Sequence, residues 1–248
     1  MRTPFKNRWT WLGGLAVMVC QLLGLSGCAC GRPASPATET VATAATGLLV
    51  CLGDSITAGE PRQIVGEGND YVTLLRNKAD NGGNGLRVQG QGRSGWTTGD
   101  YAKNIDSLVE QMPADATLVT IMLGTNDTRS DAPAAEIASQ AVQNLRAVIA
   151  RYREKAPEAK FVVISAPALY PDIHDEQMRN ANYDENGPAE VAALRDAYEN
   201  MAAEDELGFI DVSDLSSKDK SVEGVHPDAA GHVQLADRIW DGLQSNSQ

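Results

Sequence analysis

Apolar residues along this chain follow two alternating patterns: short continuous runs, and longer stretches in which they recur every three or four positions. The short runs predict buried β-strands. They cover residues 48–52, 86–89, 118–123, 161–165 and 208–212. Each run is followed by a helical stretch or by a polar loop that leads to one. Five such β-then-α units predict a parallel sheet covered by helices and joined by right-handed crossovers.

The longer stretches predict five amphipathic helices, because apolar side chains three and four positions apart share one face of a helix. Their apolar spacing begins at Tyr71, Ile105, Ile137, Val191 and Val233. Asp131 precedes Pro133 by two residues, and we expect it to cap the amino end of the third helix. Val233 is expected on the buried face of the last helix.

The first 27 residues follow neither pattern. They carry three basic residues and no acidic residue, and an apolar run extends over residues 9–25. This arrangement is typical of a secretory signal peptide, which we predict for residues 1–27. A transmembrane anchor is the alternative, but glycines and Gln21 interrupt the run, whereas a membrane span needs about 20 predominantly apolar residues.

The end of this run resembles a bacterial lipobox, in which small residues precede a cysteine that is lipidated and becomes the new amino terminus. Here it reads Leu-Ser-Gly-Cys and ends at Cys28. The resemblance implies an exported protein that lipid on Cys28 holds in the cell envelope, facing the periplasm or the cell surface. Residues 28–46 contain one large apolar residue, Val41, and are predicted to form a flexible tether. The folded domain is then expected at residues 47–248.

Composition supports one sizeable domain and excludes some functions. The 248-residue chain has 33 acidic and 21 basic residues and a formal net charge of -12, which argues against a nucleic-acid partner. Its four cysteines show no Cys-x-x-Cys spacing and its three histidines are scattered, so neither a disulfide framework nor a zinc site is expected. Cys51 lies in an apolar run and is expected to be buried. The sequence leaves open the state of Cys30 and the oligomeric state.

Four polar loops contain the residue types that catalysis requires. They cover residues 53–59, 90–95, 124–127 and 223–227. In a parallel sheet, ligands bind at the carboxyl ends of the strands, where such loops meet. The second loop also matches the G-x-G-x-x-G dinucleotide fingerprint, with Glu110 twenty residues after Gly90. That fingerprint belongs in the first βα unit of a dinucleotide-binding fold, however, and here it lies in the second.

Together the four loops, which read GDSITAG, GQGRSG, GTND and EGVHP, resemble the GDSL esterase and lipase family, also called SGNH hydrolases. The resemblance extends from residue 47 to the end of the chain. It implies a flavodoxin-like three-layer α/β/α sandwich with a five-stranded parallel sheet, and a serine hydrolase site without metal or organic cofactor. By position it makes Ser55 the nucleophile and His226 the base. It assigns the oxyanion hole to the backbone N–H groups of Ser55 and Gly92 and to the side chain of Asn126.

A carboxylate is expected to orient the His226 imidazole, which takes the serine proton during attack and returns it to the leaving group. The family usually has Asp three residues before this histidine, whereas this chain has Glu223. We expect Glu223 to take the role, because it keeps the carboxylate and other serine hydrolases use Glu here. Asp219 is the alternative, and without either carboxylate the site would be a Ser–His dyad.

The resemblance implies a serine esterase that acts on a small-molecule or glycan ester through an acyl-enzyme. Residues 92–96 (GRSGW) are most similar to the corresponding block of carbohydrate O-acetylesterases, which favours short acetyl esters on carbohydrate. A lysophospholipase or thioesterase would need an apolar acyl channel, whereas loops 60–70 and 170–190 are polar. An O-acyltransferase is a further alternative on the same scaffold. A non-catalytic binding lipoprotein would be expected to lack Ser55 or His226.

Five side chains in the predicted loops are weaker candidates for contacts with substrate. They are Arg93, Trp96, Arg129, Tyr170 and Tyr183. The aromatic rings are suited to packing against sugar faces, and ordinary packing is the alternative. Arg129 follows the third loop and would suit an anionic group of the substrate, although most such arginines are solvated or locally paired.

Overall fold

The computed structural model describes residues 46–83, 85–170, 175–215, 221 and 223–245. Within them, five parallel strands form one sheet in the order β2-β1-β3-β4-β5. The strands are β1 (Gly47–Gly53), β2 (Leu86–Gly92), β3 (Leu118–Met122), β4 (Lys160–Ile164) and β5 (Gly208–Ile210). This is the flavodoxin-like strand order, so the predicted α/β fold class is confirmed.

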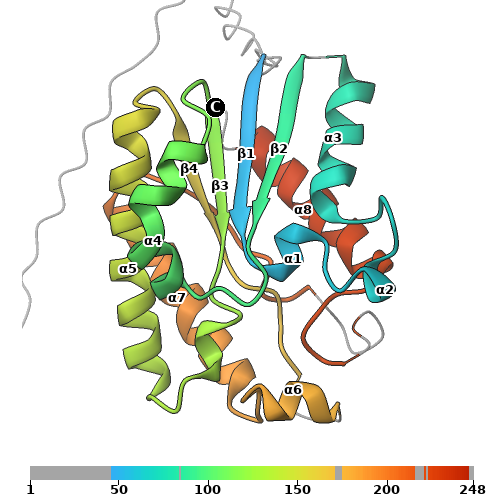
Figure 1. Cartoon of the computed structure of the whole chain (residues 1–248), viewed down its shortest axis with the longest axis vertical. Helices are drawn as coiled ribbons and strands as arrows, with labels where there is room; N and C mark the ends of the chain where they lie inside the picture. Colours follow the sequence, from blue (N-terminus) through green and yellow to red (C-terminus); the bar gives the residue numbers. More distant parts are fainter. Residues whose placement is uncertain (1–45, 84, 171–174, 216–220, 222, 246–248) are drawn as a thin grey trace, which may run out of the picture. The chain divides into compact units, whose positions relative to one another are not determined.

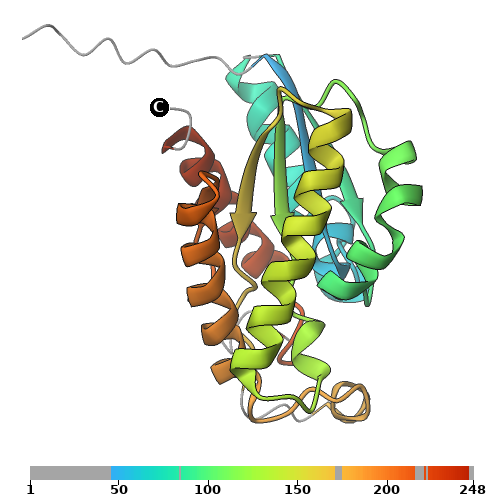
Figure 2. The same ribbon diagram turned by 90° about the vertical axis from the view of Figure 1, so that its left-hand side faces the viewer.

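Helices cover both faces of the sheet. The helices of the described part of the chain are α1 (Ser55–Ala58), α2 (Arg62–Val65), α3 (Tyr71–Gly82), α4 (Thr98–Gln111), α5 (Ala134–Lys155), α6 (Glu176–Asn180), α7 (Gly187–Glu204) and α8 (Ala229–Ser245), with a 3-10 turn η1 (Asp127–Arg129). Helices α4, α5 and α7 pack on one face, and α3 and α8 pack on the other. Figure 2 shows α7, α5 and α4 side by side in front of the sheet.

The strands are continuous apolar runs because both of their faces are buried. Successive side chains of a strand point to opposite faces, so Leu48, Val50 and Leu52 pack under α4 and α5. Leu49 and Cys51 pack under α3 and α8 instead. The prediction that Cys51 is buried is confirmed, and burial raises the pKa of its thiol to about 12, which keeps the thiol neutral.

Two expectations about helix ends and faces were wrong. Helix α5 begins directly after Pro133, which has an extended backbone and is the N-cap, while Asp131 is exposed two residues earlier and does not cap the helix. Val233 is 46% exposed on α8. The buried face of that helix runs through His232, Leu235, Ala236, Ile239 and Leu243, so in the first turn His232 rather than Val233 faces the core.

Strand ends also differ from the sequence expectation. Strand β2 continues to Gly92, because it stays in register with β1 to the pair Gly53 and Gly92. Strand β5 ends at Ile210, and the N–H of Val212 donates to the Ser165 hydroxyl oxygen at 2.8 Å instead of continuing the ladder.

The predicted signal peptide of residues 1–27, Cys28 and Cys30 lie outside the described residues. In the described part of the chain, no helix combines the length and the apolar character that crossing a membrane requires.

Candidate active site

Ser55 is positioned by the sharp exit from β1. Helix α1 begins at Ser55, and the Asp54 carboxylate caps it by accepting the Ile56 N–H at 2.9 Å. Gly59 ends this single turn in the left-handed conformation, with a φ of 70° that glycine adopts without steric cost. The short helix is therefore fixed at both ends, and Figure 1 shows α1 at the carboxyl end of β1. Ser55, the first residue of this helix, is 9% exposed.

His226 lies beside Ser55 although 171 positions separate them in the sequence. The Ser55 Oγ is 2.9 Å from the His226 Nε2. On the other side of the ring, the His226 Nδ1 hydrogen-bonds to a Glu223 carboxylate oxygen. Since an ionised carboxylate only accepts hydrogen bonds, Nδ1 carries the proton and Nε2 presents its lone pair to the serine hydroxyl. In this tautomer the imidazole is ready to take the serine proton.

Glu223 uses both carboxylate oxygens on the same histidine. One accepts from the ring, and the other accepts from the His226 backbone N–H at 3.1 Å. Burial alone would raise the pKa of Glu223, but the hydrogen bonds from His226 lower it below its ordinary value. The structure therefore brings the predicted Glu223 to the imidazole, and Asp219 lies outside the described residues.

The turn that carries this pair is held by hydrogen bonds to the Ser221 hydroxyl and to the backbone of Tyr170. Gly224 has a φ of 90°, its N–H donates to the Ser221 hydroxyl oxygen at 3.0 Å, and its carbonyl accepts from the Tyr170 N–H at 3.2 Å. Ser221 also forms an isolated antiparallel bridge with Pro227. The turn thus closes on itself and leaves the His226 ring pointing toward Ser55.

Asn126 follows β3 and is 4% exposed. Its Nδ2 donates to the Trp96 carbonyl oxygen at 2.9 Å, and its Oδ1 accepts from the Tyr183 hydroxyl at 2.7 Å. The Arg129 Nε donates to the Asn126 carbonyl oxygen at 3.1 Å and the Arg129 Nη2 to the Gly95 carbonyl oxygen at 2.8 Å. The guanidinium expected to meet an anionic substrate group thus joins the Asn126 backbone to the 95–96 segment.

Gly92 lies in β2 against the serine helix. A Cβ at this position would lie 2.3 Å from the backbone nitrogen of Ala58, so only glycine permits this packing of β2 on α1. Residues 95–96, rather than Gly92, contact Asn126 and Arg129. Gly95 was not predicted as a site residue; its φ of 77° is a left-handed conformation that favours glycine, which is the signal its identity offers.

Two further carboxylates, the buried Asp54 and the half-buried Asp127, lie next to Ser55 and Asn126 in the sequence. Burial raises the pKa of Asp54 to about 6 and also raises the pKa of Asp127. Asp127 accepts hydrogen bonds from the backbone N–H of Thr98, at 3.0 Å, and from its hydroxyl. It thereby joins the loop after β3 to the first turn of α4.

The rim of the site differs from the sequence expectation at Tyr183. This ring is buried and bonded to Asn126, so it offers no face to a sugar. Trp96 is half-buried and packs edge-on against Tyr101 with ring centroids 5.4 Å apart. Arg93 donates to the Gly92 carbonyl oxygen at 3.3 Å. Tyr170 is half-buried.

A polar cavity of about 310 Å³ lies beside Asn126. It is lined by Thr97, Asn126, Asp127, Arg129, Ser130, Ala181 and Asn182, and so by neither Ser55 nor His226. A larger cavity of about 630 Å³ opens at the opposite, amino edge of the strands, and neither Ser55 nor His226 lines it. No cluster of three or more His, Cys, Asp or Glu side chains suited to a metal ion occurs among the residues that the structure describes.

Comparisons with known proteins agree with this geometry. The model of the GDSL-like lipase/acylhydrolase family matches residues 51–234. Among solved structures, the carbohydrate acetylesterase Est24 from Sinorhizobium meliloti is 22% identical, with a TM-score of 0.62 over 81% of this chain and 99% of Est24. The aryl esterase of M. smegmatis is 22% identical, with a TM-score of 0.63 over 81% and 99% of the two chains. No curated protein matches the sequence.

Proposed function

We propose that this chain, which belongs to the GDSL-like lipase/acylhydrolase family, hydrolyses carboxylic esters with Ser55 as the nucleophile. One observation carries the proposal: the hydrogen-bonded series from Glu223 through His226 to the Ser55 hydroxyl, with a distance of 2.9 Å between Ser55 Oγ and His226 Nε2. A serine hydroxyl is a weak nucleophile unless an adjacent base removes its proton, and this series supplies that base in the required tautomer.

In the first half of the reaction, the Ser55 Oγ attacks the ester carbonyl carbon and its proton moves to the His226 Nε2. The carbonyl oxygen becomes an oxyanion, which accepts hydrogen bonds from the backbone N–H groups of Ser55 and Gly92 and from the Asn126 Nδ2. The C–O bond to the alcohol then breaks, and His226 returns the proton to the leaving oxygen. The Glu223 carboxylate stabilises the imidazolium that exists between these two proton transfers.

In the second half, water attacks the acyl-enzyme. His226 takes a proton from the water, the same donors hold the second oxyanion, and the Ser55 Oγ leaves and recovers its proton. An alcohol in place of water would make the same site an O-acyltransferase, and the competition between water and an added alcohol separates these two reactions.

The proposed substrate is a short acyl ester, most simply an acetyl ester, on a carbohydrate. The 310 Å³ cavity is lined by Asn126 and not by Ser55 or His226, and the polar side chains around it support a polar alcohol group next to the reacting ester. Segment 175–186 adds acidic and amide side chains close to this cavity, whereas a lysophospholipase or thioesterase would need apolar walls for a long acyl chain. The similarity of fold to carbohydrate acetylesterases agrees with this choice.

We further propose that residues 1–27 are removed on export and that lipid on Cys28 anchors the protein in the cell envelope. Residues 28–46 would then separate the hydrolase domain from the membrane. Mass spectrometry of the amino-terminal peptide from membrane fractions tests this proposal. An unmodified Cys28, or a retained Met1, would contradict it.

The test of the activity is hydrolysis of p-nitrophenyl acetate, butyrate and octanoate, followed by acetate release from acetylated glycans. We expect the acetate ester to be cleaved fastest, and Ser55→Ala to abolish turnover. Ser107→Ala is the matched control, because Ser107 is exposed on α4 and its hydroxyl donates to the nearby Asn104 carbonyl oxygen at 2.9 Å. Turnover that survives Ser55→Ala would contradict the proposed nucleophile, and a preference for octanoate would contradict the proposed substrate class.

A further inference from the structure

We infer that Tyr183 is a positioning residue for the oxyanion hole, because its hydroxyl fixes the orientation of the Asn126 amide. The Tyr183 hydroxyl lies 2.7 Å from the Asn126 Oδ1, and the hydrogen bond is buried. This inference rests on the proposed function, in which the Asn126 Nδ2 donates to the oxyanion.

The hydrogen-bonding partners permit only one orientation of this amide. The Trp96 carbonyl oxygen can only accept, so it must face the Asn126 Nδ2, which it does at 2.9 Å. The Oδ1 then faces Tyr183, whose hydroxyl is able to donate. In the flipped amide, two oxygens would face each other at Trp96. The Trp96 carbonyl oxygen therefore selects the orientation, and the Tyr183 hydroxyl, which is able to donate or accept, donates to the Oδ1 and holds the other end of the amide in place.

This orientation leaves one Nδ2 hydrogen for the substrate. The Nδ2 group carries two hydrogens, and within the described part of the chain only the Trp96 carbonyl accepts from it. The donor from Tyr183 also polarises the amide, which strengthens Nδ2–H as a donor toward developing negative charge. Loss of the Tyr183 hydroxyl is thus expected to affect the transition state more than the bound ester, since the oxyanion is fully formed only during reaction.

The fold holds Tyr183 rigidly enough for this role. Its N–H donates to the Met178 carbonyl oxygen at 3.2 Å, and its ring is buried. The ring belongs to a small apolar cluster with Ala166, Leu169, Val191 and Val225. Burial raises the pKa of Tyr183 above its ordinary value, so the hydroxyl keeps the proton that it donates.

The cluster also connects the two halves of the site. Val225 is the residue immediately before His226 and packs in the same cluster as the Tyr183 ring. The apolar cluster that holds the Tyr183 ring therefore also supports the turn that carries His226. Tyr183 reaches Asn126 across 57 positions of sequence, from the loop between α6 and α7.

The experiment compares Tyr183→Phe with Tyr152→Phe in hydrolysis of p-nitrophenyl acetate. Both changes keep the ring and remove one hydroxyl, and the Tyr152 hydroxyl donates to the Pro113 carbonyl oxygen at 3.0 Å away from the site. We expect Tyr183→Phe to lower kcat about tenfold, less than the 10²- to 10³-fold loss typical when an oxyanion donor is removed, with KM changed less than about twofold. Tyr152→Phe should keep the wild-type kcat.

A second arm places Tyr183→Phe in the Asn126→Ala background. If Tyr183 acts through the Asn126 amide, Tyr183→Phe should not lower kcat further in that background. An equal loss of kcat in both backgrounds would overturn the inference. Titration of Ser55 with a fluorophosphonate normalises each kcat to correctly folded enzyme, so a folding defect does not imitate the effect. An unchanged kcat in Tyr183→Phe, with Ser55→Ala inactive, would overturn this inference alone. Full activity of Ser55→Ala would instead overturn the proposed function.

Discussion

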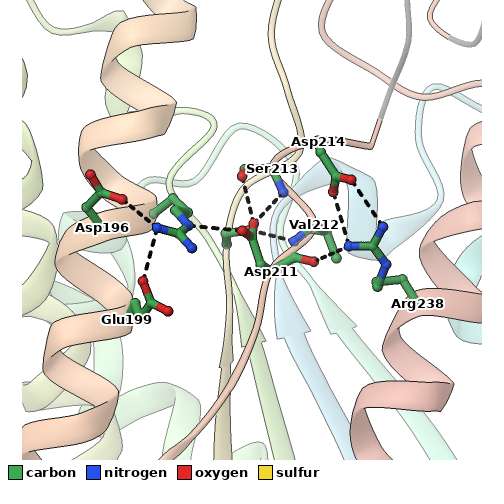
Figure 3. A network of polar contacts seen from close by, with 9 residues as sticks. Asp196, Glu199, Asp211, Val212, Ser213, Asp214 and Arg238 are labelled. Carbon is green, nitrogen blue, oxygen red and sulfur yellow. Dashed lines mark hydrogen bonds and ion pairs between the residues drawn. The ribbon is translucent and has the colours of Figure 1, made fainter.

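Two hydrogen-bonded networks lie near the carboxyl ends of the strands, and they differ in how they terminate. One is centred on Asp211, directly after β5 (Figure 3). The Asp211 carboxylate accepts from the Ser165 hydroxyl, from the N–H and hydroxyl of Ser213, and from the Arg195 Nε at 2.9 Å. Its carbonyl oxygen accepts from the Arg238 Nη1 at 3.0 Å. This network joins the ends of β4 and β5 to α7 and α8. Its outermost members are arginines that are themselves paired with other protein groups.

The network that ends at Ser55 is arranged differently. Glu223, His226 and Ser55 form a linear series of hydrogen bonds, and its last member is a hydroxyl at the edge of the sheet. The two carboxylates differ in their partners: Asp211 bonds groups that stay fixed, whereas Glu223 bonds the proposed base. Although burial would raise the pKa of Asp211, its donors lower that pKa to about 2 and hold the group as a fixed anion. Glu223 instead bonds a ring whose protonation state changes in the proposed reaction.

The largest effect is expected when the nucleophile or the base of the Ser55 series is removed. Ser55→Ala and His226→Ala should each lower kcat for p-nitrophenyl acetate by roughly 10⁴-fold or more, and their combination should cost little beyond either single change, because members of such a series act as a unit. Steady-state kinetics of the three variants checks this. Additive losses in the double variant would show that the two residues do not act in one step.

The next effect tests the carboxylate of the same series. Glu223→Gln should lower kcat by about 10³-fold, because an amide is able to donate to Nδ1 and so stabilise the wrong imidazole tautomer. Glu223→Asp, which keeps the charge, should retain more activity than Glu223→Gln. Rates measured for the two variants at pH 8 check the order. A nearly unchanged rate in Glu223→Gln would favour Asp219 or a dyad.

A carboxylate-to-amide substitution in the Asp211 network should leave catalysis intact. Asp211→Asn is expected to lower the free energy of unfolding by about 2 kcal/mol, since it weakens charge-assisted hydrogen bonds to a partly exposed group. Its kcat should stay within about twofold of wild type. Urea unfolding and ester kinetics on one preparation measure both quantities. A 100-fold loss of kcat would mean that the two networks are not separable.

The smallest expected effect compares two histidines six residues apart in the sequence. His226 is bonded to a carboxylate, whereas His232 is fully buried on α8, its Nδ1 accepts the Tyr71 N–H at 3.1 Å, and its Nε2 has no partner among the described residues. Burial lowers the pKa of His232 to about 4.

The folded protein therefore keeps His232 neutral in a pH range where the unfolded chain protonates it. The stability that this residue contributes is complete well above pH 6.5 and declines as pH falls toward 4, by about 1.6 kcal/mol between pH 6.5 and 5. Urea unfolding of wild type and His232→Gln at both values checks this. An equal loss of stability in the two proteins would assign the pH dependence to other groups.

Much of the fold could be predicted from the sequence because burial follows local patterns. The five apolar runs correspond to the five strands, since a strand buried on both faces needs apolar residues at each position. Errors occurred where a contact distant in sequence changed an end or a face. Examples are β5, which ends early because Val212 bonds Ser165, and α8, on which Val233 points outward.

The sequence by itself determined the parallel α/β architecture and the loops that supply Ser55, Asn126 and His226, because strand periodicity places those loops at one edge of a sheet. Only the tertiary structure decided that Glu223 contacts the imidazole, that Tyr183 is bonded to Asn126, and that Arg129 is engaged with backbone carbonyls. The physical reason is the distance in sequence between the residues that interact. Burial is encoded in neighbouring residues, whereas these hydrogen bonds depend on how loops far apart in the sequence fold against one another.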